Sequence, residues 1–284
     1  MDPEVVTFTI PIENNKIVFV WNITARLPEG EIYCSMLKVF SQFGPLYSLK
    51  LVPNASVAGP GYYAVLKYYS SQSARRAQAA CDKKNLFQDT PVKVQICIKQ
   101  KGFPYKSLEL YSQKCQELAN YYLGFNGWCK RIIALQNISG LDDNPEMESD
   151  PQELGKLRYL CVVEVILPYH GVCSRGVGVA EECLEKQNDP LEYILKSGKV
   201  QKYAEQKALS NAFQKILLVV LDSGKVAVEY VSGEEDNVDC LSEEELKGLI
   251  QVNDFTWAPM DAGGGEDEED WAEISFHEDT LIDS

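Results

Sequence analysis

The stretch Glu117–Trp128, with the sequence ELANYYLGFNGW, places several aromatic side chains directly before two cations, Lys130 and Arg131. Aromatic rings stack on unpaired bases, and cations bind the neighbouring phosphates, so these residue types together suit single-stranded nucleic acid. Lys130 and Arg131 are consecutive on an expected strand, so they point to opposite sides and at most one of them needs to contact a ligand. Trp128 has a structural alternative as a core anchor at the start of that strand.

Residues suited to catalysis are few. The chain has no P-loop and no Ser-His-Asp arrangement, and its histidines are His170 and His277. Its nine cysteines lack C-x-x-C spacing, which indicates reduced thiols and not a disulfide framework or a zinc site. The sequence therefore predicts a protein that is not an enzyme, with no catalytic residues, no metal ligands and no cofactor.

The charge of the chain is unevenly distributed. The net charge is −15, but residues 232–284 hold 18 of the 42 acidic residues and one of the 27 basic ones. The first 231 residues therefore carry a net charge of +2, and residues 1–101 alone carry +5. There is no apolar signal core and no uncharged run of about 18 residues, so we expect a soluble, non-secreted protein without a membrane contact.

Composition and periodicity divide the chain into three parts of α+β character. We expect a first domain at 1–101, a second at 102–231 and an acidic tail at 232–284. In the first domain, strand-like and helix-like segments alternate in the order βαββαβ. The expected strands are 16–23, 46–52, 62–69 and 92–98, and the expected helices are 31–43 and 71–81.

The first domain resembles the RNA-recognition-motif family, which has a ferredoxin-like fold. The segments Val18–Ile23 (VFVWNI) and Tyr63–Tyr68 (YAVLKY) match the two short motifs of that family, although Val65 stands where a second aromatic is usual. The resemblance implies that Phe19 and Tyr63 stack on bases. A sheet used for protein contacts is the alternative. The candidate phosphate partners around this face are Lys50, Lys67 and Lys99.

The second domain has the pattern of a helix, a meandering sheet and a long packing helix. Gly124 is a plausible end for the first helix, and the turn Phe125–Trp128 leads into the first strand. The long helix has an apolar stripe that includes Leu217 and Leu218. The expected helices are 105–123 and 199–221, and the expected strands are 129–137, 156–167 and 171–179.

This order resembles the single-strand-annealing recombination mediators, the Rad fifty-two family, from Lys106 to Lys225. Members of that family carry an L-A-N-x-x-x-G-[YF]-N-G-W run and a hairpin ending in G-x-G-V-[SA]-E, and this chain has RGVGVAE from Arg175. The match places Lys114, Phe125 and Lys215 at groove positions of the family, whereas Gln214 and Leu218 replace its cations. Arg175 is a further candidate because its glycine neighbours allow close backbone approach.

The resemblance implies binding of single-stranded DNA, with duplex DNA and RNA as further ligands, and a role in recombination, repair or the DNA-damage response. It also implies self-association, since family members form rings, and a nuclear location, with a cytoplasmic pool left open. An adaptor whose two domains have both lost ligand binding is the alternative, favoured by the lost cations.

The acidic tail, Ser232–Ser284, lacks sustained apolar periodicity and is expected to be largely disordered. Aromatic residues among its carboxylates suit docking to a protein partner. The alternatives are a solubilising tail with incidental aromatics, and a nucleic-acid mimic that covers the basic faces of the domains.

Overall fold

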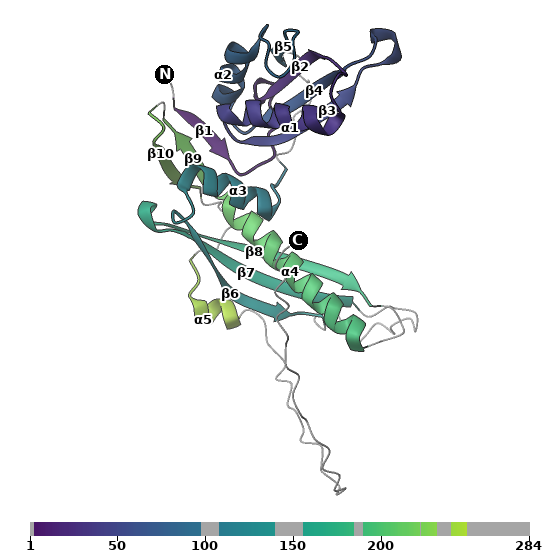
Figure 1. The fold of residues 1–284 in the computed structure, drawn as a ribbon. Helices are drawn as coiled ribbons and strands as arrows, with labels where there is room; N and C mark the ends of the chain where they lie inside the picture. Colours follow the sequence, from purple (N-terminus) through teal and green to yellow (C-terminus); the bar gives the residue numbers. More distant parts are fainter. Residues whose placement is uncertain are drawn as a thin grey trace, which may run out of the picture. The chain divides into compact units, whose positions relative to one another are not determined.

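The computed structural model describes residues 3–97, 108–139, 156–184, 190–221, 223–231 and 240–248. These residues form an α+β structure, as predicted, with one four-stranded and two three-stranded sheets (Figure 1). Lys99, one of the predicted phosphate partners, and most of the acidic tail lie outside the described residues. Within the described part of the chain, no helix is both long and apolar enough to cross a bilayer.

The N-terminal sheet has the strand order β3-β4-β2-β5, with every neighbouring pair antiparallel. Alternate residues of β2, such as Val18 and Val20, are fully buried against Ile32 and Phe40 of α1 and Ala77 of α2. One face of the sheet is therefore covered, and the βαββαβ order confirms the predicted RNA-recognition-motif fold. Its elements are β2 (Ile17–Ile23), α1 (Glu29–Phe40), β3 (Leu46–Pro53), β4 (Tyr62–Tyr68), α2 (Ser71–Cys81) and β5 (Lys93–Ile96).

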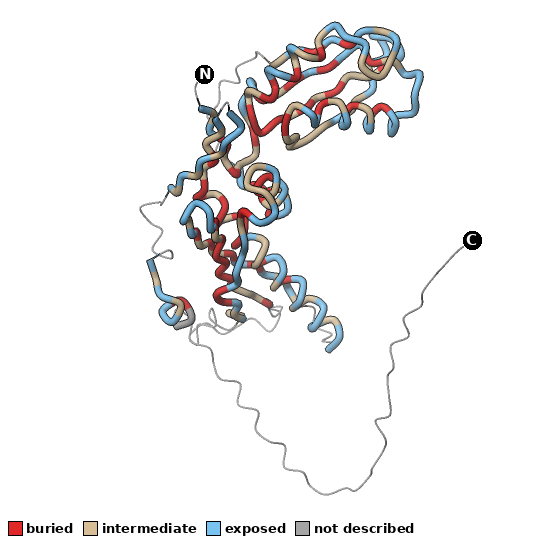
Figure 2. Tube along the Cα trace, turned by 60° about the vertical axis from the view of Figure 1, so that its left-hand side comes forward, coloured by how far each residue is buried: buried red, intermediate tan, exposed pale blue. Residues whose placement is uncertain are grey.

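The second half is built on the antiparallel sheet β6-β7-β8, with helix α4 lying along one of its faces (Figure 1). The first turns of α4 are mostly exposed (Figure 2), and the burial begins at Val200. The helix α3 also contacts α4. These elements are α3 (Ser112–Leu123), β6 (Cys129–Asn137), β7 (Lys156–Leu167), β8 (Val172–Cys183) and α4 (Pro190–Gln214).

Two glycines of β8 allow α4 to approach the sheet closely. A Cβ atom added to Gly176 would lie 2.1 Å from the carbonyl oxygen of Ala208, and one added to Gly178 would lie 2.3 Å from that of Ala204. The hydroxyl of Ser174 donates to the carbonyl of Ala212 at 2.8 Å. The close backbone approach expected at the glycines beside Arg175 is therefore that of helix α4.

The long helix ends earlier than expected. It stops at Gln214, and the run ILLVV forms strand β9 (Ile216–Val220), so Leu217 and Leu218 lie on a strand and not on the helix. Strand β9 pairs with β10 (Val226–Tyr230) on one side and with β1 (Glu4–Thr7) on the other.

Strand β1 joins the N-terminus of the chain to the second half. Val6 and Phe8 are fully buried in the core around α4, and the ring of Phe8 lies 4.7 Å from that of Phe213. These residues fall in the range expected for the first domain, but they pack with the second. Val6, Phe8 and Ile10 alternate with Thr7 and Thr9, a pattern that indicates a strand but does not reveal its partner.

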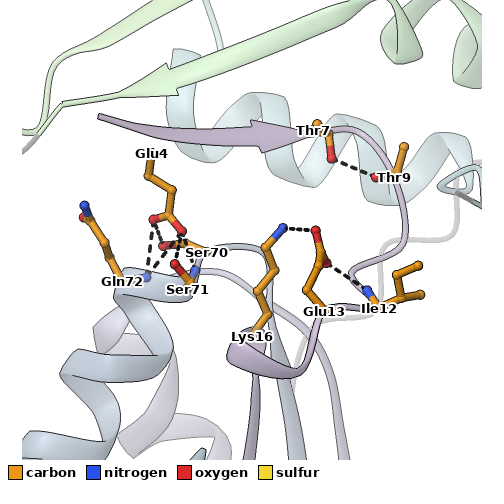
Figure 3. A network of polar contacts seen from close by, with 9 residues as sticks. All are labelled: Glu4, Thr7, Thr9, Ile12, Glu13, Lys16, Ser70, Ser71 and Gln72. Atoms are coloured by element: carbon orange, nitrogen blue, oxygen red, sulfur yellow. Dashed lines mark hydrogen bonds and ion pairs between the residues drawn. The ribbon is translucent and has the colours of Figure 1, made fainter. Parts of the chain in front are cut away.

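Glu4 on β1 places its carboxylate at the N-terminus of α2 (Figure 3). Its Oε1 atom accepts hydrogen bonds from the backbone N–H of Ser71 at 2.5 Å and from the Ser71 hydroxyl at 2.8 Å. The hydroxyl of Ser70 donates to Oε2, and the N–H of Gln72 lies 3.4 Å from both oxygens. A carboxylate at this end of a helix satisfies unpaired N–H groups and complements the helix dipole.

The acidic tail is not entirely without structure. Residues 240–248 are described and include helix α5 (Glu243–Gly248). The backbone N–H of Glu245 donates to the Ser242 hydroxyl at 3.3 Å, and the N–H of Ser242 donates to the Glu245 carboxylate at 2.7 Å. This reciprocal pair is a capping box, so the S-x-x-E signal at Ser242 was present in the sequence.

We predict that Gly178→Ala lowers the free energy of unfolding by about 1–3 kcal/mol, because the new methyl group forces α4 away from β8. Gly198→Ala, within α4 and with no atom within 4 Å of its Cβ position, is the matched control. It should leave stability unchanged or raise it by about 0.5–1 kcal/mol. Urea unfolding measures both, and equal values for the two variants would contradict the packing role of Gly178.

Candidate nucleic-acid interface

The open face of the N-terminal sheet carries three aromatic side chains. Since Val18 and Val20 point into the core, Phe19 and Trp21 point to the uncovered side, where they are 37% and 36% exposed. Tyr63 on the neighbouring strand β4 is half-buried and lines the same hollow. The hollow has a volume of about 550 Å³ and is bounded by Phe19, Trp21, Tyr63 and residues of β5.

The strand register places lysines around these rings. Phe19 pairs with Val65, which in turn pairs with Lys50 on β3. Trp21 pairs directly with Lys93 on β5. Lys50 and Lys93 are both exposed, so their ammonium groups are available to phosphates on either side of the aromatic side chains.

Phe19, Tyr63 and Lys50, three of the contact residues predicted from the sequence, lie on this face. Lys67 lies on the same strand as Tyr63 and is half-buried. Trp21 and Lys93 were missed. Alternation along VFVWNI from Phe19 was the signal for Trp21, whereas Lys93 required the β2–β5 register, which local sequence does not reveal.

The ELANYYLGFNGW turn is built mainly by packing and backbone requirements. Gly124 has a φ of +80° and ends α3, and a Cβ atom at Gly127 would lie 2.1 Å from the carbonyl oxygen of Leu123. Trp128 donates from its ring nitrogen to Asn120 at 2.8 Å and lies 5.3 Å from the ring of Phe213. Trp128 is thus a structural anchor, whereas Phe125 is 84% exposed.

Three of the candidate cations in the second half are either paired with a carboxylate or buried. Lys114 forms an ion pair with Glu117 at 2.6 Å, one turn along α3. Lys130 reaches across to Glu205 of α4 at 2.5 Å. Lys215 is only 7% exposed, whereas a cation that binds a nucleic-acid strand must be accessible to it.

Arg131 and Arg175 lie on the sheet face opposite α4 and share one carboxylate. In the strand register Arg131, Glu164 and Arg175 form a row across β6, β7 and β8. The Glu164 carboxylate is 2.7 Å from Arg131 Nη2 and 2.9 Å from Arg175 Nε. Lys130 therefore points to the α4 side and Arg131 to the other, as predicted from their adjacent positions.

The pKa of Glu164 reflects two opposed effects. Burial of the carboxylate raises the pKa, but the hydrogen bonds from Arg131 and Arg175 lower it, and the net shift is downward from the ordinary value of 4.5. Glu164 thus stays ionised at neutral pH and holds both guanidinium groups against the sheet. Among the described residues, no group of three or more His, Cys, Asp or Glu side chains could hold a metal ion.

Comparison with known proteins places this architecture in a family. The chain is 53% identical to "RAD52 motif-containing protein 1" of Gallus gallus over 261 residues, which cover 91% of each chain. It is 46% identical to the Homo sapiens protein of that name, covering 97% of this chain and 96% of the relative. The chain belongs to the RAD52 motif-containing protein 1 family. The family resemblance expected from the sequence is thereby confirmed.

Two further comparisons cover single parts of the chain. The family model "RDM1 DSRM domain" matches residues 110–217, a range that extends from α3 to the start of β9. The solved structure of the Mip6 RRM3 domain is 22% identical, covers 30% of this chain and 96% of its own, and has a TM-score of 0.25.

We predict that Glu164→Gln lowers the free energy of unfolding by about 2–3 kcal/mol at neutral pH, because two guanidinium groups lose their shared charge. Since the folded-state pKa is lowered, the stabilisation by Glu164 is fully present above about pH 4.5 and is lost as the pH falls through the folded value. The wild-type chain should therefore lose this increment on acidification, and the variant should not.

Glu181→Gln is the matched control, since Glu181 pairs with Arg158 on the same sheet face but is 59% exposed. An exposed pair contributes about 1 kcal/mol or less. Urea unfolding at several pH values from 7 to 3 gives both comparisons. A Glu164→Gln variant as stable as Glu181→Gln would show that the row of Arg131, Glu164 and Arg175 does not stabilise the sheet.

Proposed function

We propose that this chain is a non-enzymatic protein that binds single-stranded nucleic acid on the open face of the β3-β4-β2-β5 sheet. The observation that carries the proposal is the set of aromatic side chains Phe19, Trp21 and Tyr63 around one shallow hollow, with exposed lysines beside it. Aromatic faces stack on bases of any sequence, and lysines supply affinity that depends on salt and not on sequence.

The names of the relatives support a further proposal about the biological role. Because the curated relatives are named for a RAD52 motif, we propose that the ligand is single-stranded DNA, with duplex DNA and RNA also bound, and that the protein acts in recombination, repair or the DNA-damage response. A nuclear protein that self-associates fits this role, and a cytoplasmic pool is compatible with RNA binding.

A salt titration tests the proposal directly. Fluorescence anisotropy of labelled single-stranded DNA and RNA of equal length and base composition, with the full-length chain, should show binding that weakens steadily as salt is raised. The relative affinities of the two ligands decide between DNA and RNA. No binding of either at low salt would overturn the proposal.

We predict that Trp21→Ala weakens binding of single-stranded DNA about 5- to 150-fold, since a stacked base contributes about 1–3 kcal/mol. Phe19→Ala should have an effect of similar size. Tyr33→Ala, on α1 and 39% exposed, removes an aromatic ring of comparable exposure outside the hollow and should leave affinity unchanged. Equal affinities for Trp21→Ala and Tyr33→Ala would reject the aromatic face as the binding site.

The state of the cations in the C-terminal half supports another candidate function. There Lys114, Lys130 and Arg131 are each paired with a carboxylate, and Lys215 is buried. These pairings favour an interaction role for this half, with nucleic acid bound by the N-terminal sheet alone and a protein partner recruited by the acidic tail. Under this alternative, substitution of Lys114 and Lys130 by Ala leaves DNA affinity unchanged, whereas the Trp21→Ala substitution still lowers it.

A further inference from the structure

The face of the β6-β7-β8 sheet opposite α4 carries an apolar strip. On this side lie Val162 of β7 and Ile133 and Ala134 of β6, all less than 10% exposed, with Leu160 and Val177 packed beside them. The partners that bury the strip come from the acidic segment 240–248. Leu246 of α5 is 2% exposed within the same cluster, and Leu241 packs against it.

Two polar contacts also hold the start of this segment. Arg175 donates a hydrogen bond from Nη1 to the carbonyl oxygen of Leu241. Arg131 Nη1 lies 2.5 Å from the carboxylate of Glu243. The sheet face thus offers an apolar strip with two guanidinium groups, and the segment offers two leucines with a carboxylate and a carbonyl.

We infer that this face is a docking surface for an acidic helix that carries two leucines, and that residues 240–248 occupy it as an intramolecular stand-in. A partner protein with a helix of the same chemistry would displace the segment and take its place. The inference is independent of the nucleic-acid proposal, since it concerns the opposite half of the chain and a protein ligand.

The chemistry of the face favours a helix over a nucleic acid. Among the described residues, the apolar cluster beneath α5 contains aliphatic side chains and no aromatic ring on which a base could stack. Both arginines already share the Glu164 carboxylate, and each also contacts one oxygen of the segment, in Glu243 for Arg131 and in Leu241 for Arg175. A leucine pair with one carboxylate matches this face better than a run of phosphates does.

The covalent link to its own chain gives the segment an advantage over a separate helix. Residues 231–239 join the segment to the end of β10, so the segment binds in its own chain at an effective concentration on the order of millimolar. A separate helix of equal intrinsic affinity therefore competes poorly with it. Detaching the segment should open the face to the same sequence supplied as a peptide.

The test uses a fluorescent peptide with the sequence of residues 238–251 and two full-length receptors. One is the wild-type chain, and the other carries Leu241→Asp and Leu246→Asp, which detach the segment and leave the sheet unaltered. Anisotropy should show the peptide bound at least about tenfold more tightly to the variant. Equal binding to both receptors, or binding to neither, would overturn the inference.

Changes within the peptide identify the contacts without altering the fold of the receptor. Leu246→Ala in the peptide should abolish binding, and Glu243→Ala should weaken it about 1.5- to 5-fold, as expected for an exposed ion pair. Glu244→Ala is the matched control, since Glu244 is exposed and is the neighbour of Glu243, and it should bind as the parent peptide does. If the Leu246→Ala peptide bound as tightly as the parent peptide, the proposed binding mode would be contradicted.

A measurement on the unaltered chain covers the case in which the double variant does not fold. The backbone N–H of Leu246 donates to the carbonyl of Ser242 at 3.0 Å, so its hydrogen exchange reports the docked segment. Millimolar peptide should accelerate that exchange in the wild-type chain, and the Leu246→Ala peptide should not. Exchange unaffected by the parent peptide would reject the docking surface.

The same double variant also tests whether this face binds nucleic acid instead of a helix. Its affinity for single-stranded DNA should equal that of the wild-type chain, because the aromatic face lies on the other sheet. A tenfold gain in DNA affinity without peptide binding would show that the segment masks a nucleic-acid surface, and would overturn the inference. Loss of DNA binding by both chains would instead count against the proposed function and leave the peptide result standing.

Discussion

The close contact between α4 and β8 determines the arrangement of the rest of the second half. Ala204, Ala208 and Ala212 recur every four residues along α4, and the glycines of β8 lie beneath them, so backbone meets backbone without intervening side chains. The fixed helix ends at Gln214, and the chain enters β9 at Ile216. From there β9 pairs with β1, and Glu4 on β1 binds the start of α2 in the N-terminal domain. A side chain added at one glycine would therefore disturb contacts well beyond its neighbours.

Local periodicity was sufficient to predict most elements of this fold. Strands β6 and β7 and helix α2 have the predicted bounds, because their hydrophobic patterns are uninterrupted and end at clear turns. The strand β9 was missed because ILLVV continues an apolar stripe that also suits a helix, although three of its five residues are β-branched and favour a strand. Strand β1 was missed for a different reason, since its partner lies more than two hundred residues away.

The residues of the candidate site also differ in this respect: local sequence places some of them, and only long-range pairing places the others. Side-chain alternation alone places Phe19 and Trp21 on one face of β2, so the aromatic face was within reach of the sequence. Motif matching indicated where cations occur in the second half but not which carboxylates face them. Lys130 meets Glu205 and Arg131 meets Glu164 only through the fold, and a paired cation offers less to a phosphate than a free one does.

The two halves of the chain also differ in net charge. Residues 1–101 carry a net charge of +5, whereas 102–231 carry 14 basic and 17 acidic residues. A ligand with repeated phosphates is attracted by the summed field of a domain before it meets any single side chain, so the N-terminal domain is favoured for the first encounter. The second half, with its net charge of −3, offers no such attraction to an acidic segment. Residues 240–248 show how such a segment is retained, through leucines buried on an apolar strip and through Glu243 beside Arg131. Apolar packing and the local pair with Arg131, and not the summed field of the second half, therefore retain the segment.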